Sequence, residues 1–115
     1  MKVKIVEHFK SSEDNISREL IGILNDNRIV YTIGEFKHTI DISKHILKRE
    51  SDMVIYVFDF DNAICSLTLK DKNLKLDIPM KIYESIFNEG NVCLRYYLDE
   101  DEYNVIEYIL NYDVM

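Results

Sequence analysis

The sequence predicts an α+β fold: a mostly antiparallel sheet, centred on a three-stranded meander, with three to four helices packed on it. Some segments alternate between apolar and polar residues, which is typical of strands, whereas others space their apolar residues by three or four, which is typical of helices. With 115 residues, of which 47% are hydrophobic, the chain can build one core but not two. We therefore expect residues 1–115 to form a single α+β domain.

The first third of the chain predicts a strand, a helix and a second strand. Residues 2–9 alternate between apolar and polar side chains, which predicts a half-buried strand. Ser12 then precedes Asp14, and such residues typically cap a helix and fill its first turn. We expect this helix to reach about residue 26. Its apolar residues at helical spacing are Ile16, Leu20, Ile23 and Leu24. Residues 28–33 predict the second strand.

The next segment has two possible structures. Residues 35–40 alternate as a strand would, yet a helix could also begin there. A short helix is expected after Thr39 or Asp41, because either residue could cap it. The apolar side chains of this helix would be Ile42, Ile46 and Leu47.

The middle of the chain gives the clearest pattern. It predicts a three-stranded antiparallel meander made of residues 53–60, 63–70 and 74–77. The residues between these strands, Asp61 with Asn62 and then residues 71–73, are of types that tolerate the left-handed backbone angles of tight turns.

The last third predicts a helix, a strand and a final helix. Pro79 suits the first turn of a helix, and Gly90 suits the residue that ends one. The buried stripe of that helix would consist of Ile82, Tyr83, Ile86 and Phe87. Residues 92–98 alternate as a strand, and residues 100–112 predict the final helix.

Few metal or catalytic sites can be built from this sequence. The three histidines, His8, His38 and His45, lack the close spacing of metal ligands, and neither Cys65 nor Cys93 belongs to a CxxC pair. We expect both cysteines to be reduced, buried thiols that behave as small apolar residues. The glycines are isolated, so no phosphate-binding loop can be formed. We therefore expect no metal and no cofactor.

One motif has a catalytic counterpart elsewhere. Residues 57–63 are an apolar strand that ends in an Asp-x-Asp pair. This run resembles the first motif of haloacid-dehalogenase-like phosphatases, which implies Asp59 as the nucleophile and Asp61 as the acid/base. However, Ala63 stands where that family has Thr, and the strand leads directly into another strand. We favour a hairpin in which Asp61 and Asn62 supply the turn geometry, and we expect no enzymatic activity.

Nearly all of the net charge of −7 belongs to residues 96–115. Residues 1–95 contain all 14 basic side chains and 15 of the 21 acidic ones. Residues 96–115 contain six acids, no Lys or Arg, and five of the eight tyrosines. On a helical wheel, the apolar residues of segment 100–112 cover more of the circumference than one sheet face needs. That surface could be core or could contact another chain, and the run of four acids favours a partner.

The sequence therefore predicts a small acidic, non-enzymatic protein that docks on a basic nucleic-acid-processing protein, such as a nuclease or a toxin, and inhibits it. Immunity proteins against nuclease toxins and phage anti-CRISPR proteins are similar to it in size and charge. The candidate protein-binding residues are Tyr97, Asp99, Glu100, Asp101, Glu102, Glu107, Tyr108 and Tyr112. The alternatives are a homodimeric structural or regulatory subunit and, third, a small enzyme that uses Asp59 and Asp61.

The charge and apolar pattern also exclude some partners. A net negative charge opposes direct binding to nucleic acid, and no apolar run approaches the roughly 18 residues of a membrane span. The N-terminal strand lacks the apolar region of a signal peptide. We therefore expect a cytoplasmic protein. Its abundance of Ile, Asn, Lys and Tyr, which AT-rich codons encode, points to a low-GC bacterium or one of its phages.

Overall fold

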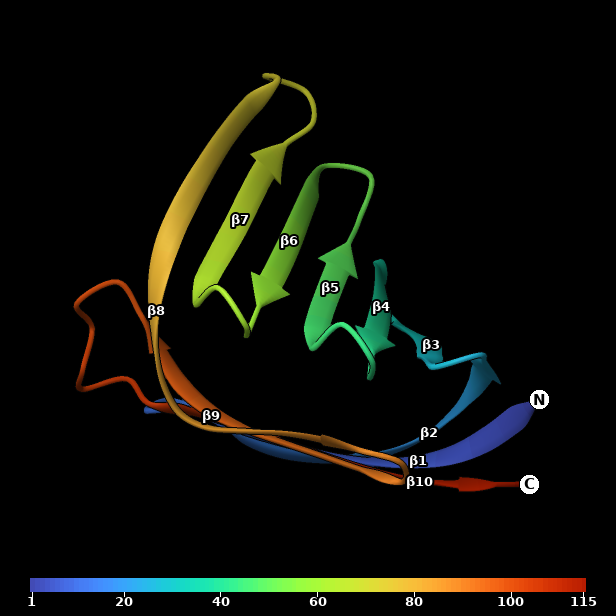
Figure 1. The fold of residues 1–115 in the computed structure, drawn as a ribbon. Helices are drawn as coiled ribbons and strands as arrows, with labels where there is room; N and C mark the ends of the chain where they lie inside the picture. Colours follow the sequence, from blue (N-terminus) through green and yellow to red (C-terminus); the bar gives the residue numbers. More distant parts are fainter.

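The computed structural model describes residues 1–115 and contains ten antiparallel strands that close into a barrel (Figure 1). The strands are β1 (Lys2–Lys10), β2 (Asn15–Asn25), β3 (Arg28–Ile33), β4 (Phe36–Asp41), β5 (Ile46–Glu50), β6 (Val54–Asp59), β7 (Ile64–Leu69), β8 (Leu74–Asn88), β9 (Asn91–Leu98) and β10 (Ile106–Val114). Each strand pairs with the next one along the chain, and β1 also pairs with β10. The structure contains no helix, and thus none that could cross a membrane. The predicted α+β fold with three to four helices is therefore wrong.

The barrel has two groups of strands (Figure 1). Strands β4–β7 stand side by side, and β1, β2, β9 and β10 cross beneath them. Strand β8 belongs to both groups, because its first half pairs with β7 and its second half pairs with β9. The turns after the even-numbered strands lie at the same strand ends as the two chain termini, and we call this the termini end. The turns after the odd-numbered strands lie at the opposite end, the far end.

The core is the inward face of the strands. Neighbouring strands place buried side chains opposite one another, as in the pairs Leu47–Phe58 and Leu94–Tyr108. The sixteen buried apolar residues are Val3, Ile5, Ile29, Tyr31, Ile40, Leu47, Phe58, Phe60, Cys65, Met80, Val92, Leu94, Tyr96, Tyr108, Leu110 and Tyr112. Each large aliphatic or aromatic side chain buried in this way contributes roughly 1.5–3 kcal/mol to stability.

The strand predictions are confirmed. Residues 2–9, 28–33 and 92–98 lie in β1, β3 and β9, and the predicted meander forms β6, β7 and the start of β8. Residues 35–40, for which strand and helix were both possible, lie in β4 (Phe36–Asp41) except for Glu35. In these segments, alternation with period two predicted the strand correctly.

The helix predicted up to residue 26 is instead strand β2. Its alternate residues do point inward, but the outward positions include Ile21, which is 63% exposed, and Ile23. Apolar residues on both faces of a strand produce spacings of three and four by chance, and these resemble a helix. The inward position of Gly22 lies against the backbone oxygen of Val30, so only a residue without a side chain fits there.

The helix predicted after Pro79 is the second half of β8. A bulge between Ile82 and Glu84 shifts the register with β9, so the inward face changes from even-numbered to odd-numbered residues. Ile82 and Phe87 consequently pack on the core, whereas Tyr83 and Ile86 are exposed. The apolar residues of this strand, inward and outward together, fall three and four apart, as on a helix face. Gly90 ends no helix but occupies a hairpin turn at φ 87°.

The two other helices are also absent. Residues 99–105 form a loop, and β10 follows with strict alternation of its inward residues: Ile106, Tyr108, Leu110, Tyr112 and Val114. Asp41 does cap backbone N–H groups, but they belong to the turn between β4 and β5, and Ile46 and Leu47 begin β5. Ile, Val, Tyr and Phe favour strands, and this preference outweighs the helical spacing.

Candidate functional site

A buried carboxylate lies inside the barrel. Glu7 occupies an inward position of β1 and is only 3% exposed. Its Oε2 accepts hydrogen bonds from the hydroxyl of Tyr31 and from that of Tyr108, the latter at 3.1 Å. Its Oε1 accepts one from Arg18 Nη1 at 3.3 Å. Three strands far apart in sequence, β1, β3 and β10, thus meet at one charge, and Arg18 on β2 balances it.

The two tyrosines act as hydrogen-bond donors. Burial, together with the charge of Glu7, raises the pKa of Tyr31 far above its usual range. Burial and the neighbouring Tyr31 and Glu7 raise the pKa of Tyr108 in the same direction. Both hydroxyls therefore keep their protons at neutral pH, and the two hydroxyls also contact each other.

Next to this cluster lie His38 and Arg49, each with one buried nitrogen atom that makes no hydrogen bond. His38 on β4 stacks on Tyr31, with ring centroids 4.7 Å apart, and Arg49 lies opposite His38 on β5. Burial and the positive charge of Arg49 lower the pKa of His38 to about 4, so its ring is neutral at pH 7. His38 Nδ1 and Arg49 Nε are both buried, and neither has a hydrogen-bond partner. The guanidinium lies 4.9 Å from the ring centre of Phe36.

These groups line a cavity of about 300 Å³ inside the barrel. Its polar lining residues are Glu7, Arg18, His38 and Arg49, together with the exposed Asp14. Its other lining residues are Phe9, Ile16, Leu47, Phe58, Tyr96 and Tyr108. A cavity lined by apolar side chains and a few polar groups is typical of small-molecule binding sites.

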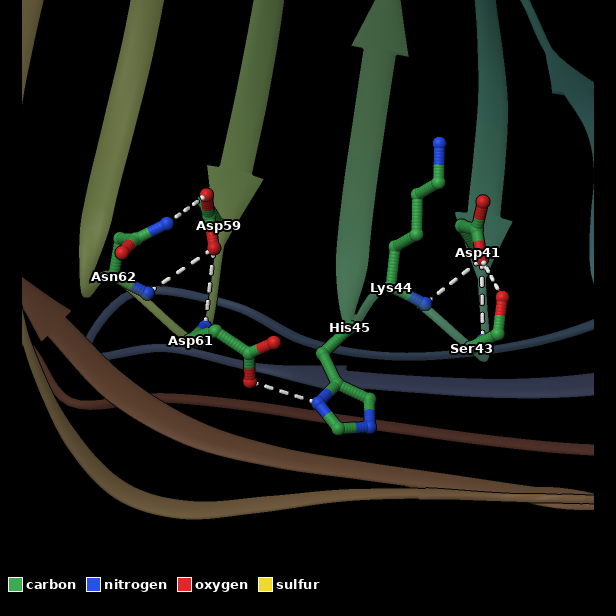
Figure 2. A network of polar contacts seen from close by, with 7 residues as sticks. All are labelled: Asp41, Ser43, Lys44, His45, Asp59, Asp61 and Asn62. Atoms are coloured by element: carbon green, nitrogen blue, oxygen red, sulfur yellow. Dashed lines mark hydrogen bonds and ion pairs between the residues drawn. The ribbon is translucent and has the colours of Figure 1, made fainter.

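A second polar network lies at the termini end (Figure 2). Asp59 Oδ1 accepts hydrogen bonds from the backbone N–H groups of Asp61 and Asn62, both at 3.1 Å, and its Oδ2 accepts one from Asn62 Nδ2 at 2.8 Å. The bond from the Asn62 side chain is the main reason why the pKa of Asp59 lies below its usual value. Asp61 in turn accepts a hydrogen bond from His45 Nδ1 at 2.8 Å. The predicted hairpin is confirmed, although the left-handed residue in it is Ala63, at φ 55°.

Both oxygens of Asp59 are therefore engaged in holding its own turn, and Asp41 does the same for the preceding turn through Ser43 and Lys44. This is the local pairing by which Asp and Asn stabilise turns. No three His, Cys, Asp or Glu side chains of the structure lie together in a way that could hold a metal ion.

The predicted protein-binding residues divide into three groups. Tyr108 and Tyr112 are buried in the core, at inward positions of β10. Tyr97 and Glu107 lie on the strands and are half-buried. Only the four acids of the β9–β10 loop are fully at the surface: Asp99, Glu100, Asp101 and Glu102. Of the three predicted tyrosines, only Tyr108 lines the cavity, and none of them lies in the β9–β10 loop with the four acids.

Sequence reasoning missed the buried cluster. Glu7 interrupts the inward row of β1, after Val3 and Ile5 and before Phe9, and a charge at an inward position of a strand is a signal that could have found it. Arg49 interrupts the inward row of β5 after Leu47 in the same way. Comparison with protein-family models gives no match, and neither does comparison with curated proteins.

Proposed function

We propose that the protein binds a small molecule inside its barrel. The observation that carries this proposal is the cavity of about 300 Å³, in whose wall His38 Nδ1 and Arg49 Nε are buried without partners. Nearly all buried polar atoms in proteins are hydrogen-bonded, because an unpaired one costs about 1–3 kcal/mol. A ligand that hydrogen-bonds to these atoms would remove that cost.

The architecture supports the same function. A barrel of about eight strands is just wide enough to be filled by side chains or to hold one small ligand. In this ten-stranded barrel, apolar side chains near the termini end, such as Val3, Ile29 and Val92, are fully buried. The cavity lies farther toward the far end, and Asp14 in its lining is exposed to solvent.

Binding of the fluorescent probe 8-anilinonaphthalene-1-sulfonate tests this proposal. We expect saturable fluorescence enhancement with one probe per chain. Ile16→Trp would fill the cavity from β2 and abolish the enhancement, whereas Ile21→Trp, on the outward face of the same strand, would leave it unchanged. A probe that does not bind, or that binds equally to both variants, would refute binding in the cavity.

A second candidate function is the inhibition of a basic protein by the acidic loop between β9 and β10. The observation that favours it is the loop Asp99–Glu102, whose four carboxylates are exposed and are followed by Tyr103, which is 89% exposed. Hydrogen bonds from Ser12 to Asn104 tie this loop to the first hairpin. The loop therefore has a defined position from which a basic partner could be attracted.

Capture of partners from a bacterial lysate at low and high salt tests this second candidate. The variant D99N/E100Q/D101N/E102Q should lose basic partners that the wild-type protein retains at low salt. A control variant with the same change in net charge, E13Q/D52N/D71N/E89Q, should retain them. Equal capture by the two variants would show that the loop has no special role, and a dimer in size-exclusion chromatography would instead support the homodimeric subunit.

A further inference from the structure

The charged group that remains without a hydrogen bond in the cavity is a donor. Glu7 already accepts three hydrogen bonds, from Tyr31, Tyr108 and Arg18. Arg49, by contrast, makes no hydrogen bond and has no acidic side chain within ion-pair distance, and its Nε is buried. A partner for Arg49 must therefore be an acceptor. The planar guanidinium matches a carboxylate, which can accept two parallel hydrogen bonds from it.

An unfilled apolar surface begins beside Arg49. Arg49 lies opposite Tyr56 in the register of β5 and β6, and its guanidinium lies 5.9 Å from the centre of that ring. The inward rows of β6, β7 and β8 continue from there to the far end as paired apolar residues. We call them the leucine wall: Val54, Tyr56, Leu67, Leu69, Leu74 and Leu76.

The leucine wall shares the inward face with the core but is not covered by it. Leu76 pairs with Leu67, two residues from the buried Cys65, so its side chain lies on the same face as the core. Yet Leu74 is 43% exposed and Leu76 is 48% exposed. Apolar side chains on the concave face of a barrel, next to an unpaired arginine, form a surface that is polar at one end and apolar along its length.

We infer that the cavity and the leucine wall beside it together bind an amphipathic organic carboxylate. Its head group lies on Arg49 at the cavity, and its apolar body lies along the leucine wall of β6–β8, whose residues lie outside the cavity lining. This inference rests on the proposed binding of a small molecule. Asp14 does not cancel the attraction, because it is exposed to water at the edge of the cavity, where its charge is screened. His38 stays neutral beside the head group and can donate a further hydrogen bond to it from one ring nitrogen.

Calorimetric titration with decanoate and decanol at pH 7.5 tests the inference, because the two probes share a hydrocarbon chain and differ in their head group. We expect the wild-type protein to bind decanoate about tenfold more tightly than decanol, which is the ratio expected of a charge-assisted hydrogen bond against a neutral one. Arg49→Gln should weaken decanoate binding about tenfold and leave decanol unchanged. Lys48→Gln, which removes the same charge from the outward position next to it, should change neither.

The possible results distinguish the two proposals. Equal affinity of the wild-type protein for decanoate and decanol would overturn the carboxylate inference and leave the binding function standing. If neither decanoate nor decanol binds and the fluorescence of the probe is not enhanced, both the binding function and the carboxylate inference are overturned. Leu76→Gln tests the position of the body and should weaken decanoate and decanol by the same factor, whereas an unchanged affinity for both would contradict the leucine wall as the binding surface.

Discussion

Replacing Tyr108 by Phe removes one hydroxyl from the buried cluster and leaves the ring that packs in the core. The hydroxyl donates to Glu7 Oε2 at 3.1 Å, and a hydrogen bond to a charged group contributes about 1.5–3 kcal/mol. Glu7 keeps its bonds from Tyr31 and Arg18, so no orphaned charge adds to the loss. We therefore expect Tyr108→Phe to lower the free energy of unfolding by about 2 kcal/mol.

Tyr112 provides the matched control. It lies on the same inward row of β10, four residues on, and is as buried as Tyr108, but its hydroxyl bonds no protein atom. Tyr112→Phe should therefore change stability by less than about 0.5 kcal/mol. Urea unfolding followed by tyrosine fluorescence or circular dichroism measures both variants. The dependence of the free energy on urea should stay unchanged, since neither variant alters the surface exposed on unfolding.

The expected difference in stability between Tyr108→Phe and Tyr112→Phe is large enough to measure. For a chain of this length, about 2 kcal/mol corresponds to a fall in Tm of roughly 8 °C, which is well outside the error of a melting curve. If Tyr108→Phe and Tyr112→Phe unfold at the same urea concentration, the hydroxyl of Tyr108 contributes nothing, and the description of Glu7 as the centre of a stabilising network is refuted.

Three further predictions concern the interior. Gly22→Ala should lower stability by about 2 kcal/mol in urea unfolding, because its Cβ would lie 2.6 Å from Ile5 Cδ1 and 2.8 Å from the backbone oxygen of Val30. His38 has a pKa of about 4 when folded and about 6.5 when unfolded, so the unfolded chain takes up its proton first. Stability should fall as the pH falls from about 6.5 to 4, and His38→Gln should flatten this dependence; an unchanged slope would contradict it. Cys65 is fully buried with its pKa raised to about 11, so it should react with Ellman's reagent only as fast as the protein unfolds.

Several strands could be predicted from the sequence because one of their faces is polar. In β1, Lys2 and Lys4 alternate with Val3 and Ile5, and this pattern has no helical interpretation. In β2 the pattern fails, because Ile21 points outward and the inward position next to it is a glycine. Pattern alone then cannot separate a strand from a helix, and residue preference has to decide.

Composition contained the missing information. Ala63 is the only alanine of the chain, so the residue with the highest helix propensity is nearly absent, whereas the strand-favouring Ile, Val, Tyr and Phe are abundant. The bulge in β8, on the other hand, could not be predicted. The bulge depends on how Ile82 and Glu84 pair with β9. The spacing of apolar residues within β8 alone does not show how that strand pairs with its neighbour.

The candidate site could not be predicted either, because it also depends on pairing between strands. Glu7, Tyr31, His38 and Arg49 come from four strands, and only closure of the barrel between β1 and β10 brings the hydroxyl of Tyr108 to Glu7. An α+β sandwich would have placed the same residues on separate surfaces. The acidic loop is independent of closure, and its exposure could be predicted from its charge alone.

The position of the charges inside the barrel is an argument for function in itself. An apolar side chain at an inward position stabilises a barrel, whereas a buried ion pair is often no better than neutral, because desolvation cancels most of the attraction. Glu7 is at least fully hydrogen-bonded, and its network joins four strands. Arg49 has aromatic contacts with Phe36 and Tyr56, but no hydrogen bond or ion pair balances its charge, and it lowers the pKa of His38 beside it. The aromatic rings leave the buried Nε without an acceptor, and the anionic head group of the proposed ligand would supply one.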